Sequence, residues 1–409
     1  MSSLPRPFSA GCRTLWLPRK SWKRIIPSAE GIFARGGGRG IAVMVKNRKK
    51  TSKIFQAALF AASVALLVYF CVSGNNLVIL LNSLPHLNPF WLACAAGSVV
   101  LGWAMDASVL YELVRHACGG GYTFRSAFRT AMVGQYFNAV TPYAVAGQPM
   151  QFVVLLHQGV ASGIAVSTLV RKFLVYQMSI TCYSLLVIVV RYHFFRAKIQ
   201  GFMALAFIGF LCQSATVVVL LLFTYSPVFT TRLIQGVVWV LTKLHVVRQP
   251  EDTRKKVRGQ LQFYLDNNRA MKGNRLLSAR IYGFTLLQLT AMFLVPFFIY
   301  KAFHSPGAPI FDMIAAQSFV TMISSYTPLP GAAGAAEGSF LVIFQLFFKQ
   351  DVITQAMLLW RLLAYYSCVA VGVFFVGFGG RREELRAGLR EVELKKAGGA
   401  AGGEGTMQK

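Results

Sequence analysis

Thr141 to Pro149 reads TPYAVAGQP and Thr327 to Glu337 reads TPLPGAAGAAE, and these two segments decide how the chain folds. Each interrupts an apolar stretch with proline and glycine, which remove a backbone donor and loosen a helix. The apolar arms that precede them, 126–140 and 311–326, reach only about 22 to 24 Å at 1.5 Å per residue. The arms that follow, 150–156 and 338–348, are shorter. We therefore expect two helix–break–helix hairpins, with ordinary kinked helices as the alternative.

Six other apolar segments pass the length test for a membrane span, which requires about 20 apolar residues. They are 54–73, 90–110, 173–190, 202–223, 281–300 and 352–378. Six crossings make the first hairpin start from one membrane face and the second from the opposite face. The sequence thus predicts an all-α polytopic membrane protein with about six full spans and two opposed re-entrant helical hairpins, in an inverted-repeat-like arrangement.

Composition and charge support a membrane location. The 409 residues are 55% hydrophobic and only 14% charged, which argues against a water-soluble enzyme. The formal charge of +28 would suggest a nucleic-acid partner in a soluble protein. Between residues 54 and 242, however, the only acids are Asp106 and Glu112, and most of the basic excess lies in the polar blocks 1–50, 243–280 and 379–409. We therefore expect lipid partners and no nucleic acid.

The distribution of Lys and Arg also predicts the orientation. The linker 74–89 contains neither residue, whereas Arg115, Arg125 and Arg129 follow the second span. The positive-inside rule then places both termini in the cytoplasm. The cluster formed by Arg191, Arg196 and Lys198 disagrees with this topology, because it would face outward.

The charge pattern divides the chain into three expected parts. Residues 1–50 are expected to form a basic, disordered cytoplasmic tail, in which Met44 is a second possible start. Residues 51–378 are expected to form the transmembrane domain and 379–409 a cytoplasmic tail. Within the domain, 243–280 is expected to be a basic cytoplasmic loop. Seven scattered cysteines and six histidines without metal-ligand spacing predict no catalytic residue, no metal site and no cofactor.

Ionisable side chains at membrane depth cost about 2.5 to 3.5 kcal/mol each unless they are paired or hydrated. Glu337 ends the second break and Arg361 lies inside the last span, so we predict an ion pair whose role is either packing or function. Arg171 and Lys172 interrupt a helix that starts near Ser162. They either snorkel to the interface or clamp a lipid phosphate. Asp106 is expected to be an interfacial charge.

The breaks also supply neutral polar groups and helix ends that suit an anionic headgroup or a polar solute. Asn138, Thr141, Gln148 and Gln151 provide the donors and acceptors of the first break. The complete predicted substrate-contacting set is Asn138, Thr141, Pro142, Gly147, Gln148, Gln151, Arg171, Lys172, Thr327, Pro328, Pro330, Gly331, Gly334, Glu337 and Arg361.

The two breaks resemble the signature segments of the lysylphosphatidylglycerol synthase transmembrane region family, a flippase-like family. The resemblance covers about 54–378 and rests on Asn138 to Gln151 and on Thr327 to Gly338. The family pattern implies a glutamate and a basic residue in the first break, where this chain has Gln148 and Gln151. An expected acidic–Arg pair on the following helix appears as Arg171 and Lys172. The chain resembles the membrane module alone, without the soluble aminoacyl-transfer domain.

The resemblance implies a bacterial inner-membrane protein that moves a phospholipid or polyprenyl-linked lipid between leaflets. An intramembrane lipid-modifying transferase, or a helper subunit that presents lipid to a separate enzyme, is the first alternative. A carrier of a small solute is the second. Substrate, direction, energy coupling and oligomeric state are not fixed by the sequence.

Overall fold

The computed structural model describes residues 84–118, 120–198, 202–226, 274–305, 307–327 and 329–377, with Val78 and Arg232 as isolated positions. The first predicted span, both terminal tails, Pro328 and most of the predicted loop 243–280 lie outside these residues.

The described residues form helices and no strands. In chain order the elements are η3 (Leu84–His86), α5 (Pro89–Cys118), α6 (Phe124–Val140), η4 (Pro142–Ala144), α7 (Gly147–His157), α8 (Ser162–Lys198), α9 (Phe202–Tyr225), α12 (Arg275–Ala302), α13 (Ile310–Ser324), η5 (Pro330–Ala332), α14 (Ala335–Phe344), α15 (Ile353–Arg361) and the π-helical turn η6 (Leu362–Tyr366). The last helix continues beyond η6 to Gly377.

Five of the six predicted spans fall on observed helices, and the remaining one lies outside the described residues. Among the described residues, four helices are long and apolar enough to cross a membrane: α5, α8, α12 and the helix from Ile353 to Gly377. In α9 the apolar stretch with described side chains, Gly209–Leu222, is shorter than a full span.

Short polar side chains define several helix starts. The Thr123 hydroxyl accepts a hydrogen bond from the Ser126 amide at the start of α6, and the Asn274 side chain accepts one from the Leu277 amide at the start of α12. Such caps satisfy backbone donors that a first helical turn leaves unpaired. Because Asn274 begins a helix, the end of the stretch expected as a loop, from Arg275 to Arg280, is helical.

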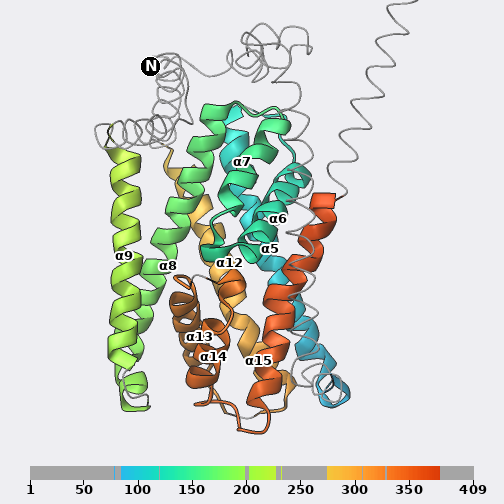
Figure 1. The fold of residues 1–409 in the computed structure, drawn as a ribbon, viewed down its shortest axis with the longest axis vertical. Coiled ribbons are helices and arrows are strands. Elements are labelled where there is room, and N and C mark those ends of the chain that lie inside the picture. The colour runs from blue at the N-terminus through green and yellow to red at the C-terminus, as the bar shows by residue number, and fades with distance from the viewer. Residues whose placement is uncertain are drawn as a thin grey trace, which may run out of the picture.

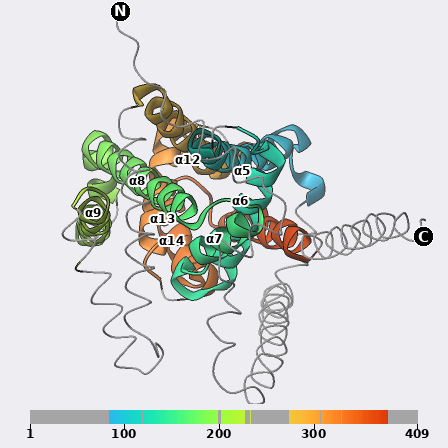
Figure 2. The same ribbon diagram turned by 90° about the horizontal axis from the view of Figure 1, so that it is seen from above.

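Small residues bring α5 and α12 together, and these helices lie side by side in Figure 2. A Cβ atom on Gly102 would lie 2.6 Å from the Met292 methyl carbon, so the methionine packs in the space that the glycine leaves. One turn away, the Ser98 hydroxyl donates to the Ala291 carbonyl across 2.6 Å. Close approach through small residues and hydrogen bonds is the usual way in which membrane helices associate.

Both predicted breaks are present, and the hairpins that contain them approach from opposite ends of the molecule. The arms α6 and α7 occupy the upper half of Figure 1, whereas α13 and α14 occupy the lower half. Within each pair the two arms pack against each other. The structure thus has the helix–break–helix form at both segments rather than two continuous kinked helices.

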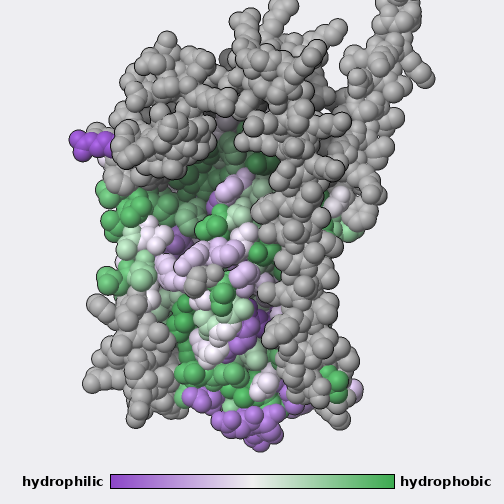
Figure 3. All heavy atoms as spheres, in the orientation of Figure 1, coloured by the Kyte–Doolittle hydropathy of each residue, from purple (hydrophilic) through white to green (hydrophobic). Residues whose placement is uncertain are grey.

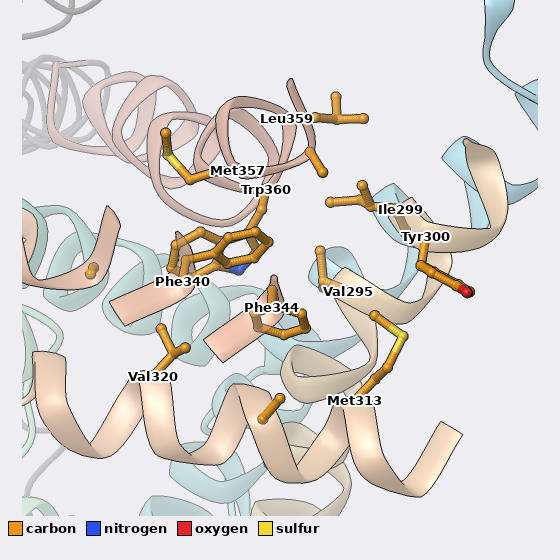
Figure 4. Packing of buried hydrophobic residues seen from close by; sticks show 14 of the residues in the cluster. Val295, Ile299, Tyr300, Met313, Val320, Phe340, Phe344, Met357, Leu359 and Trp360 are labelled. Atoms are coloured by element: carbon orange, nitrogen blue, oxygen red, sulfur yellow. The ribbon is translucent and has the colours of Figure 1, made fainter. Parts of the chain in front are cut away.

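An aromatic cluster anchors the second hairpin to the last helix. Phe340 on α14 stacks on Phe344 at 4.3 Å and on Trp360 of α15 at 5.0 Å between ring centroids. Figure 4 shows these rings facing Val295 and Ile299 of α12. Aromatic stacking adds to the burial of their large apolar surfaces. The second break is therefore held between two rigid helices.

Candidate functional site

The two breaks have the same backbone conformation although their sequences differ. In each, a proline is followed by two left-handed residues: Tyr143 and Ala144 after Pro142, and Gly331 and Ala332 after Pro330. In each, the amide three residues after the proline points back to the proline carbonyl, as in a type I′ turn. Left-handed backbone costs about 1 to 2 kcal/mol for a residue with a Cβ atom. Strain repeated at two equivalent positions is typical of a functional region.

The breaks meet each other. The turns η4 and η5 lie in contact. Tyr365, on the last helix, donates its hydroxyl to the Ala139 carbonyl just before the first break at 2.9 Å. The last helix therefore touches both breaks, since Arg361 one turn earlier reaches the second.

Asn138 and Thr141 hold the first break in shape. The Asn138 side-chain oxygen accepts a hydrogen bond from the Gly147 amide at 3.0 Å, and Thr141 accepts a weaker one from the Ala146 amide at 3.3 Å. A Cβ atom on Gly147 would lie 2.1 Å from the Asn138 oxygen, which explains the glycine at that position. Both polar side chains thus have a structural partner at the start of α7.

Arg361 organises the second break. Its Nη2 lies 2.7 Å from a Glu337 carboxylate oxygen, and its Nη1 donates to the Gly331 carbonyl at 2.9 Å. Its guanidinium also lies 5.3 Å from the Trp360 ring centroid and 5.4 Å from that of Tyr365. The same Glu337 oxygen accepts the Gly334 amide at 2.7 Å. The ion pair predicted between Glu337 and Arg361 is therefore present.

A turn of π-helix, η6, starts directly after Arg361. Single π-helical turns occur frequently at functional sites, because they re-aim the side chains around them. The turn directly follows Arg361, which binds the second break, and it contains Tyr365, which binds the chain just before the first break.

A cavity of about 270 Å³ lies between the breaks. Polar side chains gather at mid-height on the face shown in Figure 3, between hydrophobic regions. From the predicted set, Asn138, Thr327, Gly331 and Arg361 line the cavity. Six further polar residues line the cavity and were not predicted from the sequence: Tyr143, Gln317, Thr321, Ser324, Ser325 and Tyr365.

Two buried polar atoms of the cavity residues have no hydrogen-bond partner among the described residues. They are the Gln317 side-chain oxygen and the Arg361 Nε, on side chains that are 5% exposed in each case. A buried polar group without a partner costs about 1 to 3 kcal/mol. Each of the two atoms has less than 1 Å² exposed, so it lies behind the cavity surface rather than at it.

The other predicted site residues take different positions. Thr141, Pro142, Gly147, Pro330, Gly334 and Glu337 belong to the breaks or to their supports but do not line the cavity, and Pro328 lies outside the described residues. Gln148 and Gln151, on α7, also lie outside the lining. Gln151 is buried against Gly134 of α6, where a Cβ atom would lie 2.1 Å from the glutamine nitrogen.

The pair Arg171 and Lys172 does not reach the cavity either. The Lys172 ammonium lies 2.9 Å from both Asp106 carboxylate oxygens, and both residues are buried. Lys172 and Asp106 therefore neutralise each other inside the helix bundle, and neither side chain is free to extend to the protein surface. Arg171 donates to the Ser278 hydroxyl at 2.9 Å, near the start of α12.

Arg191, one of the basic residues that disagreed with the predicted topology, has an acidic partner. Arg191 Nε lies 2.7 Å from an Asp312 carboxylate oxygen in the first turn of α13. The pair removes the net positive charge of Arg191 at that end of the molecule.

Replacing Gly331 tests the close packing of the second break. Gly331→Ala is expected to cost about 2 to 4 kcal/mol of unfolding free energy, because left-handed strain is added to overpacking. The new Cβ atom would lie 2.4 Å from the Tyr365 ring. Gly334→Ala is the matched control, since Gly334 is also left-handed (φ +83°) but has open space at its Cβ position. Thermal unfolding in detergent that gives equal losses for both variants would contradict the packing argument.

The described residues contain no group of three or more His, Cys, Asp or Glu side chains that could hold a metal ion. Their chemistry at the cavity consists of one cation, Arg361, together with amide and hydroxyl groups. This set can bind and orient a polar group.

Comparison with protein families shows where the chain belongs. The family described as "Lysylphosphatidylglycerol synthase TM region" matches residues 54–372, most of the chain. No curated protein matches it. The match and the long apolar helices make the protein an integral, multi-pass membrane protein. The chain belongs to the lysylphosphatidylglycerol synthase transmembrane region family.

Proposed function

We propose that this protein moves a phospholipid or a polyprenyl-linked lipid between the two leaflets of the bacterial inner membrane. The observation that carries the proposal is the cavity of about 270 Å³ between two breaks that belong to hairpins from opposite ends of the molecule. Broken helices at membrane depth are tolerated where they line a wet cavity, and paired breaks in oppositely oriented halves mark a transport site.

The lining suits a lipid headgroup. Arg361 contributes a guanidinium group, Gln317 contributes an amide, and Thr321 and Ser324 add hydroxyl groups. Guanidinium groups are good partners for phosphate oxygens. The exposed side chains of Tyr143, an aromatic ring with a hydroxyl, and of the apolar Leu329 also line the cavity. Their exposure supports lateral access for a molecule whose tails stay in the hydrocarbon while its headgroup enters.

The proposed topology has six crossings, counting 54–73, with α6–α7 and α13–α14 as re-entrant hairpins and both termini in the cytoplasm. Arg115, Arg125 and Arg280 near the ends of α5, α6 and α12 support this orientation. The proposed domain boundaries remain 51–378 for the transmembrane domain, with tails at 1–50 and 379–409.

Transport is tested with purified protein in liposomes that contain a lipid with a fluorescent headgroup. A membrane-impermeant quencher reaches only about half of the label in protein-free vesicles. Protein that moves the lipid is expected to bring the inner-leaflet label out, so that the quenched fraction rises above half within minutes. Phospholipid and polyprenyl-phosphate probes are compared in parallel. Equal quenching with and without protein, for every lipid class, would refute the proposal.

A further inference from the structure

A second cavity, of about 530 Å³, lies away from the breaks and shares no lining residue with the first. Three helices form it: α8 with residues from Cys182 to Arg191, α12 with Leu286, and α13 with residues from Phe311 to Ala315. Its volume falls within the range of small-molecule sites, about 300 to 1,000 Å³. We propose that this cavity is a binding site for one membrane phospholipid, with an acyl chain in the groove and the phosphate on Arg191.

The groove is apolar and open along one side. Leu186, Val190 and Phe311 line it while remaining 63%, 65% and 70% exposed. Exposed apolar side chains at a membrane-facing surface contact lipid tails. A groove between such side chains holds an acyl chain in place, whereas a flat surface leaves the acyl chain free to move. The α8–α13 contact forms the floor of the groove.

The end of the groove at Arg191 favours a phospholipid over an uncharged lipid, because the guanidinium offers hydrogen-bond donors to a phosphate although Asp312 balances its net charge. Arg191 is the one basic side chain among the described residues that line the groove. It lies seven residues before the last residue of α8, which is about 10 Å along the helix. A headgroup near that helix end would place its phosphate beside the guanidinium, while its chain would run along α8 toward Cys182.

Asp312 fixes the guanidinium without covering it. Its carboxylate is 5% exposed and lies 2.7 Å from the buried Nε of Arg191, whereas the Arg191 side chain as a whole is 35% exposed. No partner of Nη1 or Nη2 is found among the described residues. The Asp312 carboxylate lies on the Nε side as an ion-pair partner without a hydrogen bond, which leaves the two terminal nitrogens for two phosphate oxygens.

The test uses photo-crosslinking in proteoliposomes. Two probes carry the same photoreactive acyl chain, one as a phospholipid and one as a diacylglycerol that lacks the phosphate. The phospholipid is expected to label peptides 182–191 and 311–315 about tenfold more than the diacylglycerol does, the ratio expected for a charge-assisted hydrogen bond. The exposed α9 residues Leu211, Val218 and Val219 serve as an internal control for bulk lipid and are expected to label equally with both probes.

Two variants separate the charge from the groove. R191Q/D312N replaces the ion pair with a neutral amide pair, so neither buried charge is left alone. It is expected to reduce phospholipid labelling of the groove to the diacylglycerol level. C182F fills the groove from an exposed position and keeps Arg191, and it is expected to reduce labelling with both probes. Equal labelling of the groove by the two probes in the wild-type protein, or labelling unchanged in R191Q/D312N, would overturn the proposal.

Discussion

Arg361→Gln is expected to abolish lipid movement and to cost about 3 to 5 kcal/mol of unfolding free energy, the range for breaking one side of a buried ion pair. Arg361 is 5% exposed and joins Glu337 to the Gly331 carbonyl. Without Arg361, the largely buried Glu337 carboxylate and the Gly331 carbonyl of the second break both lose their partner. The quenching assay measures transport, and thermal unfolding in detergent measures stability.

Three further variants make this result interpretable. Arg361→Gln with Glu337→Gln replaces the pair with two amides and is expected to recover most of the stability but not the transport. Arg361→Lys keeps the charge but loses the planar guanidinium that contacts Glu337 and the Gly331 carbonyl at the same time, so partial transport is expected. Arg115→Gln removes an exposed arginine and is expected to change neither quantity. Wild-type transport in Arg361→Gln would mean that the pair is outside the transport path.

Much of the fold follows from local chemistry and was predictable for that reason. Thr141-Pro142 and Thr327-Pro328 end the preceding arms because proline cannot continue a helix hydrogen-bond ladder. The observed α6 ends at Val140, two residues before Pro142, and α13 ends at Ser324, four residues before Pro328. The pairing of Glu337 with Arg361 was also accessible, because few charges occur at that depth and each needs a partner.

The cavity lining was less predictable because it depends on which face of a helix turns inward. Gln317, Thr321 and Ser324 lie at intervals of four and three residues, so they share one face of α13. This spacing was a usable signal, but the arm as a whole reads as apolar. Conversely, Gln148 and Gln151 looked like site residues, yet Gln151 fills the space that Gly134 leaves on α6.

Pairing across distant helices was the least accessible feature. Asp106 and Lys172 are 66 positions apart. Their contact depends on the rotation and offset of α5 against α8, which no local pattern specifies. The same holds for Arg191 and Asp312. An unpaired charge in an apolar helix indicates that a partner exists but does not identify it.

Lys172→Met is expected to destabilise the protein by about 3 to 5 kcal/mol, because the Asp106 carboxylate would be left buried without its counter-ion. Asp106 is 4% exposed. Lys172→Met with Asp106→Leu removes both charges and keeps similar volumes, so its stability is expected to return close to that of the wild type. Lys349→Met is the control for loss of an exposed lysine. Thermal unfolding in detergent measures all three.

The same double variant decides between packing and transport for this pair. Neither Asp106 nor Lys172 lines the cavity between the breaks. We therefore expect Lys172→Met with Asp106→Leu to move lipid at the wild-type rate once it is folded. If the double variant were stable but inactive, the ion pair would belong to the transport mechanism, and the path of the headgroup would have to extend from the breaks along α8 toward Lys172. Stable and active protein would instead assign the pair to helix packing and leave Arg361 as the charge that acts on the lipid.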